Sequence, residues 1–139
     1  MFTVLILEDD RINLDVLGAV MRFHGYDVMQ ATTGEEAIAL SKERSHIDLL
    51  ICDVAVGVSS GTEVALKVCS IHADVLVLFI SGTPMYAWEK RDVNNFLKLP
   101  LDSVDCLEKP LRPSALLAKV NELLEKRAQR PRGRTAGGR

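Results

Sequence analysis

Short apolar runs alternate with helical patterns along this chain, and few folds accommodate such an alternation. Apolar runs of strand length occupy residues 3–7, 26–31, 47–52, 75–80 and 104–107. Patterns with helical spacing follow these runs at residues 11–24, 33–42 and 60–70, from Thr83 onward and from Pro113 onward. Such alternation implies parallel strands joined by right-handed crossovers. We therefore predict a doubly wound α/β fold, a five-stranded parallel sheet with helices on both faces.

Local signals predict where several helices begin and which side they bury. Thr33 with Glu36 and Ser60 with Glu63 have the spacing of capping boxes. Thr83 before Pro84 suits an N-cap followed by the first helical residue. The face predicted for the first helix consists of Ile12, Val16, Leu17, Val20 and Phe23. The face predicted for the last helix consists of Leu116, Leu117, Val120 and Leu123, with Leu124 alongside.

The length and composition suit one domain. A chain of 139 residues, 47% hydrophobic and 26% charged, can bury one sizeable core. Its longest apolar runs fall well short of the ~18 residues of a membrane span, and its N-terminus lacks the basic start of a signal peptide. Cys52, Cys69 and Cys106 have no CxxC spacing and suit buried, reduced thiols. We predict a cytoplasmic protein that does not bind a membrane.

Charge is distributed unevenly along the chain. Residues 127–139 contain five arginines and no acidic residue, which leaves residues 1–126 with 12 basic against 19 acidic residues, a net charge of −7. An acidic body is a poor binder of nucleic acid. Residues 127–139 are too polar to pack, so we predict one domain over 1–126 and a disordered basic tail over 127–139. The alternative is that this tail attracts nucleic acid or another anionic partner.

Polar residues follow four of the five predicted strands. Glu8-Asp9-Asp10 follow the first, Asp53 the third, Ser81 the fourth and Glu108-Lys109 the fifth. Function in parallel α/β sheets gathers at the carboxyl ends of the strands, where these side chains would meet. Carboxylates that lie so close together raise one another's pKa unless a cation binds between them. The pattern predicts a metal site with Asp53 as the reactive group beside it.

These motifs, in this order, resemble the receiver domain of two-component response regulators, the CheY-like domain, over about residues 2–126. The resemblance rests on the acidic cluster, on Asp53, on Gly61 eight residues later, on Ser81-Gly82 and on Lys109-Pro110. It implies the flavodoxin-like strand order 2-1-3-4-5, which alternation alone does not determine.

The resemblance also implies roles for the acidic residues. Asp53 would be the nucleophile that accepts a phosphoryl group as an acyl phosphate. Mg²⁺ would be held by Asp9 directly, by Glu8 through water, by Asp53 and by the backbone carbonyl of Ala55. The pair could instead be Asp9 and Asp10, but counting from the strand favours Glu8 and Asp9, with Asp10 as a helix N-cap or first-turn acid.

Lys109 and Ser81 would complete the site. Lys109 would pair with Asp53 and then with a phosphoryl oxygen, and Ser81 would donate a hydrogen bond to the phosphoryl group and so move the following loop. The implied protein is a single-domain phosphoacceptor switch and not an enzyme, apart from slow self-dephosphorylation. The implied partners are a sensor histidine kinase or a histidine phosphotransfer protein and an unidentified downstream protein, and homodimer formation stays open.

Three features depart from the family pattern. Cys106 occupies the position, three residues before the lysine, where an aromatic residue commonly takes part in the switch. Val56-Gly57 replaces a Met-Pro type of pair, which predicts a more flexible loop. The stretch 85–103 is longer than usual and contains Tyr86, Trp88 and Phe96. For Phe96 we predict ordinary packing, whereas Trp88 suits packing and a partner surface equally.

Three other classes of function share part of this pattern. The departures raise the alternative of a receiver-like interaction module that works without phosphorylation. A phosphatase of the haloacid dehalogenase type is disfavoured because it needs a second Asp two residues after the nucleophile, where this chain has Ala55. A flavodoxin-type cofactor carrier is disfavoured because acids, which repel phosphate, follow the first strand.

Overall fold

A five-stranded parallel sheet forms the centre of the molecule. The computed structural model describes residues 2–129. The strands of the sheet are β1 (Thr3–Leu7), β2 (Asp27–Ala31), β3 (Leu49–Asp53), β6 (Leu76–Ser81) and β7 (Val104–Glu108), in the order β2-β1-β3-β6-β7. This arrangement confirms the predicted 2-1-3-4-5 order. A small antiparallel pair that was not predicted, β4 (Ala55–Val56) and β5 (Ser59–Ser60), follows β3.

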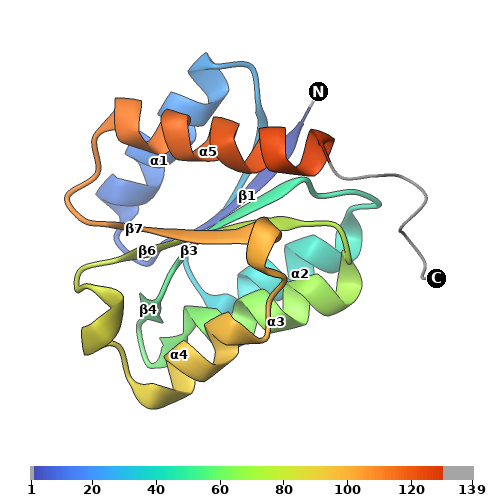
Figure 1. The fold of residues 1–139 in the computed structure, drawn as a ribbon. Coiled ribbons are helices and arrows are strands. Elements are labelled where there is room, and N and C mark those ends of the chain that lie inside the picture. Colours follow the sequence, from blue (N-terminus) through green and yellow to red (C-terminus); the bar gives the residue numbers. More distant parts are fainter. Residues whose placement is uncertain (1, 130–139) are drawn as a thin grey trace.

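Helices cover both faces of the sheet, as predicted. In Figure 1, α1 (Arg11–Phe23) and α5 (Pro113–Ala128) lie on one face, and α2 (Gly34–Glu43), α3 (Gly61–Ile71) and α4 (Lys90–Leu97) on the other. Short 3₁₀ helices, η1 (Met85–Ala87) and η2 (Leu101–Ser103), flank α4. Within residues 2–129, no helix combines the length and the apolar character needed to cross a bilayer.

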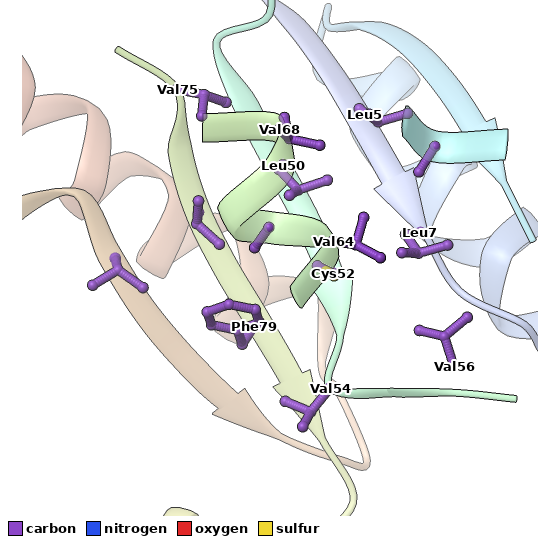
Figure 2. Packing of buried hydrophobic residues seen from close by; sticks show 14 of the residues in the cluster. Leu5, Leu7, Leu50, Cys52, Val54, Val56, Val64, Val68, Val75 and Phe79 are labelled. Atoms are coloured by element: carbon purple, nitrogen blue, oxygen red, sulfur yellow. The ribbon is translucent and has the colours of Figure 1, made fainter. Parts of the chain in front are cut away.

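The core has two halves because side chains of a strand point alternately to opposite faces. In β1, Val4 and Ile6 pack with residues of α1 and α5, whereas Leu5 and Leu7 belong to the cluster beneath α2 and α3. Figure 2 shows this second cluster, with Phe79 of β6 pointing from the sheet towards the helices. Every residue of β1, β3 and β6 is buried, which explains their continuous apolar sequences.

The buried face of α1 differs from the prediction. Of the predicted face, Leu17 is buried and Val20 is partly buried, but Ile12, Val16 and Phe23 are exposed, and Leu14 and Met21 are buried in their place. Both stripes have helical spacing, but the second includes Gly18, whose missing side chain lets Gln30 of β2 come within 3.1 Å of the Cβ position. The helix therefore packs most closely on the side that carries the glycine. The predicted face of α5 is correct, since Leu116, Val120 and Leu123 are buried.

Side-chain caps begin three of the helices. Thr33 accepts a hydrogen bond from the backbone N–H of Glu36, and Ser60 from that of Thr62, so both predicted N-caps are confirmed. The Glu36 carboxylate accepts from the backbone N–H of Thr32 instead of Thr33, so the predicted capping box is shifted by one residue. Asp10 caps α1 by accepting from Ile12 and Asn13.

The predicted start of the fourth helix is wrong. Thr83 and Pro84 precede only the 3₁₀ helix η1, and α4 begins at Lys90. The reason is that the backbone of Thr83 bonds to side chains: its carbonyl accepts from Ser81 Oγ and Trp88 Nε1, and its N–H donates to Ser81 Oγ. The long stretch 85–103 is thus two 3₁₀ turns around a short helix.

The cysteine prediction holds only in part, because Cys52 is buried but Cys69 and Cys106 are partly exposed.

Asp48 joins three segments at the amino ends of the strands. Its buried carboxylate accepts from the backbone N–H of Thr3 at 2.8 Å, contacts His46 Nε2 at 2.6 Å and accepts from Arg127 Nη2 at 3.1 Å. Helix α5 thus continues past the predicted boundary at 126, and Arg127 contacts the fold. Residues 130–139 of the predicted tail lie outside the described residues, so the division into domain and tail stays a prediction.

Asp48→Ala should lower the free energy of unfolding by about 3 kcal/mol, because it leaves several donors without their charged acceptor. Burial is the largest influence on the pKa of Asp48 and raises it, but the hydrogen bonds from Thr3, His46 and Arg127 together lower it. A carboxyl group whose pKa is lower in the folded than in the unfolded protein stabilises the fold at any pH above its unfolded-state pKa. This stabilisation is lost as the pH falls through the folded-state pKa. Urea titrations from pH 7 down to pH 3 should therefore show the two proteins converging in acid.

Asp27→Ala is the matched control. Asp27 also pairs with an arginine, Arg44, but both side chains are more than a third exposed. Its loss should change the free energy of unfolding by less than about 1 kcal/mol. Equal effects of the two substitutions would contradict the anchoring role of Asp48.

Candidate functional site

The carboxyl ends of β1 and β3 bring three carboxylates together. Glu8 and Asp9 follow β1 directly, and Asp53 is the last residue of β3. Pairing of Leu7 with Cys52 places the ends of these strands side by side. One oxygen from each of Glu8, Asp9 and Asp53 lies within 4.8 Å of the others. The predicted acidic cluster therefore exists as a compact group of hard oxygen ligands.

Lys109 supplies the positive charge of the site. Its Nζ lies 2.8 Å from Asp53 Oδ2 and 3.1 Å from Glu8 Oε1. The residue follows β7, and its backbone N–H donates to the carbonyl of Ser81 at 2.7 Å, which ties the ends of β6 and β7 together. The peptide bond from Lys109 to Pro110 is cis. Asp53 and Lys109 are thus paired, as the resemblance implied.

Glu8 is the most buried acid of the site, only 1% exposed. Its Oε2 accepts from the backbone N–H of Asp10 at 3.0 Å, whereas Oε1 makes no hydrogen bond despite its nearness to Lys109. Burial and the charge of Asp53 raise the pKa of Glu8, against the lowering effects of the Asp10 N–H and Lys109. A buried oxygen without a hydrogen bond, among other carboxylates, is suited to a cation or to water bound to one.

The pKa of Lys109 is raised for the complementary reason. Burial is the largest influence and lowers it, but the hydrogen bond to Asp53 and the ion pair with Glu8 together outweigh burial. The ammonium form is therefore fixed at neutral pH.

The loop after β3 holds Asp9 in place. The backbone N–H of Gly57 donates to Asp9 Oδ2 at 2.9 Å, and the N–H of Ala55 donates to Asp53 Oδ1 at 3.3 Å. Gly57 has a φ of +58°, a conformation that glycine adopts without strain. Since Asp10 caps α1, the geometry favours Glu8 and Asp9 over the alternative pair Asp9 and Asp10. The contact from Gly57 to Asp9 was not predicted, because only its flexibility is evident from sequence.

Gly61 allows the backbone to pass close to the acidic residue. A Cβ at this position would lie 1.8 Å from the carbonyl oxygen of Asp53, and the Gly61 N–H donates to the carbonyl of Val54 at 2.7 Å. The start of α3 is thus packed against the end of β3. This contact explains physically why a glycine stands eight residues after Asp53.

Ser81 borders the site, but its hydroxyl is bonded elsewhere. It donates to the carbonyl of Thr83 at 2.7 Å and accepts from the N–H of Thr83 at 3.1 Å and from Trp88 Nε1 at 3.0 Å. Trp88 is only 9% exposed, so of the two alternatives predicted for it, packing within the fold is the one observed. The hydrogen bond from Trp88 was not predicted, because it depends on the irregular path of residues 82–89.

A groove of about 440 Å³ lies beside Asp53. Its lining includes Asp53, Ala55, Ser81, Trp88 and Arg91. The Asp53 carboxylate thus borders an open groove and is not enclosed, with a lysine and two further acids beside it. A group that reaches Asp53 from solvent could react there.

Comparison with known proteins agrees with this geometry. Response regulator SaeR of Staphylococcus epidermidis is 26% identical over 121 residues, which cover 87% of this chain and 49% of SaeR. Aerobic respiration control protein ArcA of Escherichia coli K12 is 28% identical over 123 residues, which cover 88% of this chain and 48% of ArcA. The chain therefore spans about half the length of these curated relatives.

A solved structure has the same fold. The CheY-like response regulator receiver domain protein from Methanospirillum hungatei JF-1 matches with a TM-score of 0.78 and 25% identity, over 92% of this chain and 97% of that one. The family model for the response regulator receiver domain matches residues 4–121. Sheet order, acidic edge and sequence match agree, and the chain belongs to the response regulator receiver domain family of two-component signalling.

Proposed function

We propose that this receiver domain accepts a phosphoryl group on Asp53 from a sensor histidine kinase or a histidine phosphotransfer protein, and that this changes its protein-binding surface around α4 and β7. The observation that carries the proposal is the ammonium of Lys109, 2.8 Å from Asp53 inside a cluster of three carboxylates. A cytoplasmic location accompanies the proposal, in keeping with three free cysteines. The downstream protein is one that distinguishes the two states of this surface.

The same residues fit a Mg²⁺ ion. Asp9, Glu8 and Asp53 would hold it together with the backbone carbonyl of Ala55, and the buried Glu8 Oε1, which makes no hydrogen bond, is supporting evidence. Mg²⁺ suits such a site because it takes few protein carboxylates and completes its coordination with water and phosphate oxygens. When bound, it would supply positive charge to the phosphoryl oxygens.

The protein side chains would share the work as follows. An Asp53 carboxylate oxygen attacks phosphorus, the phosphorus–nitrogen bond of the phosphohistidine breaks, and the imidazole leaves with the bonding electrons. Lys109, already beside Asp53, transfers its hydrogen bond to a phosphoryl oxygen, and the Ser81 hydroxyl turns to donate to another. Later hydrolysis of the acyl phosphate returns the switch to its first state, so the protein is a phosphoacceptor and not a catalyst with turnover as its purpose.

Labelling tests the proposal directly. The full chain should take up a phosphoryl group from acetyl phosphate, and bind beryllofluoride (a phosphoryl mimic), only when Mg²⁺ is present, as measured by intact mass and by ¹⁹F NMR. Asp53→Asn keeps the shape of the side chain but removes the nucleophilic carboxylate, and should abolish both signals. Unchanged labelling in Asp53→Asn, or labelling of the original chain without divalent cations, would refute the assignment.

Glu8→Gln should separate the metal role from the fold. Without Mg²⁺ at pH 7, the variant should gain about 1 kcal/mol in the free energy of unfolding, because the penalty for burying the charge of Glu8 outweighs its ion pair with Lys109. The sign follows from the raised pKa of Glu8. The contribution of Glu8 to stability is most favourable at a pH below its unfolded-state pKa, and it is lost as the pH rises through its folded-state pKa. Added Mg²⁺ should raise the melting temperature of the original chain but not of Glu8→Gln.

Glu35→Gln is the control for this experiment, because Glu35 is an exposed acid in the first turn of α2. It should leave both the metal-free stability and the Mg²⁺ response unchanged. A Mg²⁺ response that persists in Glu8→Gln would contradict the proposed ligand set.

One observation favours a second candidate, a module that binds its partner without phosphorylation. Cys106 stands where the family's switch commonly has an aromatic ring, and a thiol cannot swing as a ring does. In that case partner affinity would be the same with and without beryllofluoride. Isothermal titration of a captured partner under both conditions separates the two candidates.

A further inference from the structure

The hydroxyl of Ser81 is fully occupied in this structure. A serine hydroxyl has one donor and two acceptor positions. Ser81 Oγ donates to the carbonyl of Thr83 and accepts from the N–H of Thr83 and from Trp88 Nε1. It must give up part of this set before it can donate to anything attached to Asp53.

Trp88 can hold this position because its ring is wedged in place. The indole packs edge-on against Phe79 of β6, with ring centres 6.2 Å apart, and against Phe96 of α4, with ring centres 5.9 Å apart. Phe79 is fully buried, and Phe79 and Phe96 also contact one another. The direction of the indole N–H is therefore set by three mutually packed rings, one of which belongs to α4.

The neighbouring strand leaves room beside this cluster. Cys106 of β7 pairs with Phe79 across the sheet, and its small side chain borders a hollow of about 160 Å³ that Ser81 and Trp88 also line. The aromatic ring that contacts Ser81 thus comes from the loop before α4 and not from β7. The lengthened loop and Cys106, noted separately in the sequence, meet at this point.

We propose that Trp88 is a positioning residue that holds the Ser81 side chain against the Thr83 turn, so that rotation of this side chain towards a phosphoryl group on Asp53 breaks the hydrogen bond between Trp88 and Ser81. This inference rests on the proposed function and deepens it. When Ser81 turns to the phosphoryl group, its proton leaves the Thr83 carbonyl, which lies 3.2 Å from Trp88 Nε1 and receives the indole N–H alone. The rearrangement reaches α4 through Phe96.

Removing the indole N–H should therefore make switching easier. Trp88→Phe keeps an aromatic ring but has no N–H, so the Ser81 hydroxyl in the unphosphorylated state no longer accepts a hydrogen bond from residue 88. One hydrogen bond corresponds to about a two- to tenfold change in an equilibrium constant. Beryllofluoride should bind Trp88→Phe more tightly by that factor in Mg²⁺, as measured by ¹⁹F NMR on the full chain.

A double-mutant cycle with Ser81→Ala distinguishes positioning from packing. In a chain that already carries Ser81→Ala, adding Trp88→Phe should leave beryllofluoride affinity unchanged, because there is no hydroxyl to hold. Phe96→Leu is the packing control: it loosens the same ring cluster but leaves the indole N–H in place, and should not tighten binding. The same gain from Trp88→Phe in both backgrounds, or from Phe96→Leu, would overturn the inference.

Trp88 also reports on itself, because it is the sole tryptophan of the chain. Saturating beryllofluoride should change its fluorescence in the original chain, but not in Ser81→Ala. An equal change in both would overturn the inference. Failure of the original chain to bind beryllofluoride would overturn the proposed function and this role with it, whereas normal binding with no effect of Trp88→Phe would overturn this role alone.

Discussion

Gly61→Ala is expected to destabilise the protein by about 3 kcal/mol or more, at the upper end of what overpacking costs. The added Cβ would lie 1.8 Å from the Asp53 carbonyl oxygen and 2.9 Å from Cys52 Sγ. The backbone atom cannot turn away as a side chain would, so β3 and α3 must separate. Asp53 would shift with its backbone, and a shift of about 1 Å can slow a positioned reaction by about a hundredfold.

The prediction is checked by urea denaturation and by the rate of labelling with acetyl phosphate. Gly82→Ala is the matched control, because a Cβ at Gly82 has no heavy atom within 4 Å. It lies in the loop after β6 and should change stability by less than about 1 kcal/mol. Gly61→Ala with the stability and labelling rate of the original chain would mean that α3 does not lie against Asp53 as described.

Phe79→Ala should lower the free energy of unfolding by about 3–5 kcal/mol. Phe79 is fully buried in the cluster of Figure 2, and its ring contacts both Trp88 and Phe96. The substitution leaves a cavity between β6 and α4 and releases the two other rings. Besides the lower urea midpoint, Trp88 fluorescence in the folded protein should shift to longer wavelength as water reaches the indole.

Phe23→Ala removes the same ring from the surface. Phe23 is 85% exposed at the end of α1, so its loss should cost less than about 1 kcal/mol. Sequence alone would assign these two phenylalanines similar roles, and the first prediction for α1 did count Phe23 as core. A large effect of Phe23→Ala would mean that α1 is turned towards the originally predicted face.

The fold was predictable because its signals are local and repeated. Every strand of the sheet begins and ends within two residues of its predicted position, since buried strands have continuous apolar sequences. The rotation of α1 was not predictable in the same way. Two overlapping apolar stripes share that helix, and which of them is buried depends on packing against the sheet and α5, which are contacts between elements.

The site divides along the same line. Glu8, Asp9, Asp53 and Lys109 could be brought together from sequence, because each follows a strand of a parallel sheet. The hydrogen bonds from Gly57 to Asp9 and from Trp88 to Ser81 could not, because each depends on the path of an irregular loop. Thr83 shows the difficulty: it has a good N-cap sequence, yet its backbone is occupied by Ser81 and Trp88.

The carboxylate of Asp48 holds both ends of the described chain near the amino ends of the strands. It binds Thr3 near the start and Arg127 near the finish, and it stands just before β3, whereas Asp53 closes that strand at its other end. The described chain therefore ends, at Gln129, on the side remote from the acidic residues. A fluorescent protein, an affinity handle or a sensor-chip linkage placed there should keep the kinase approach clear, whereas ending the polypeptide at Lys126 would remove the arginine that fastens the last helix.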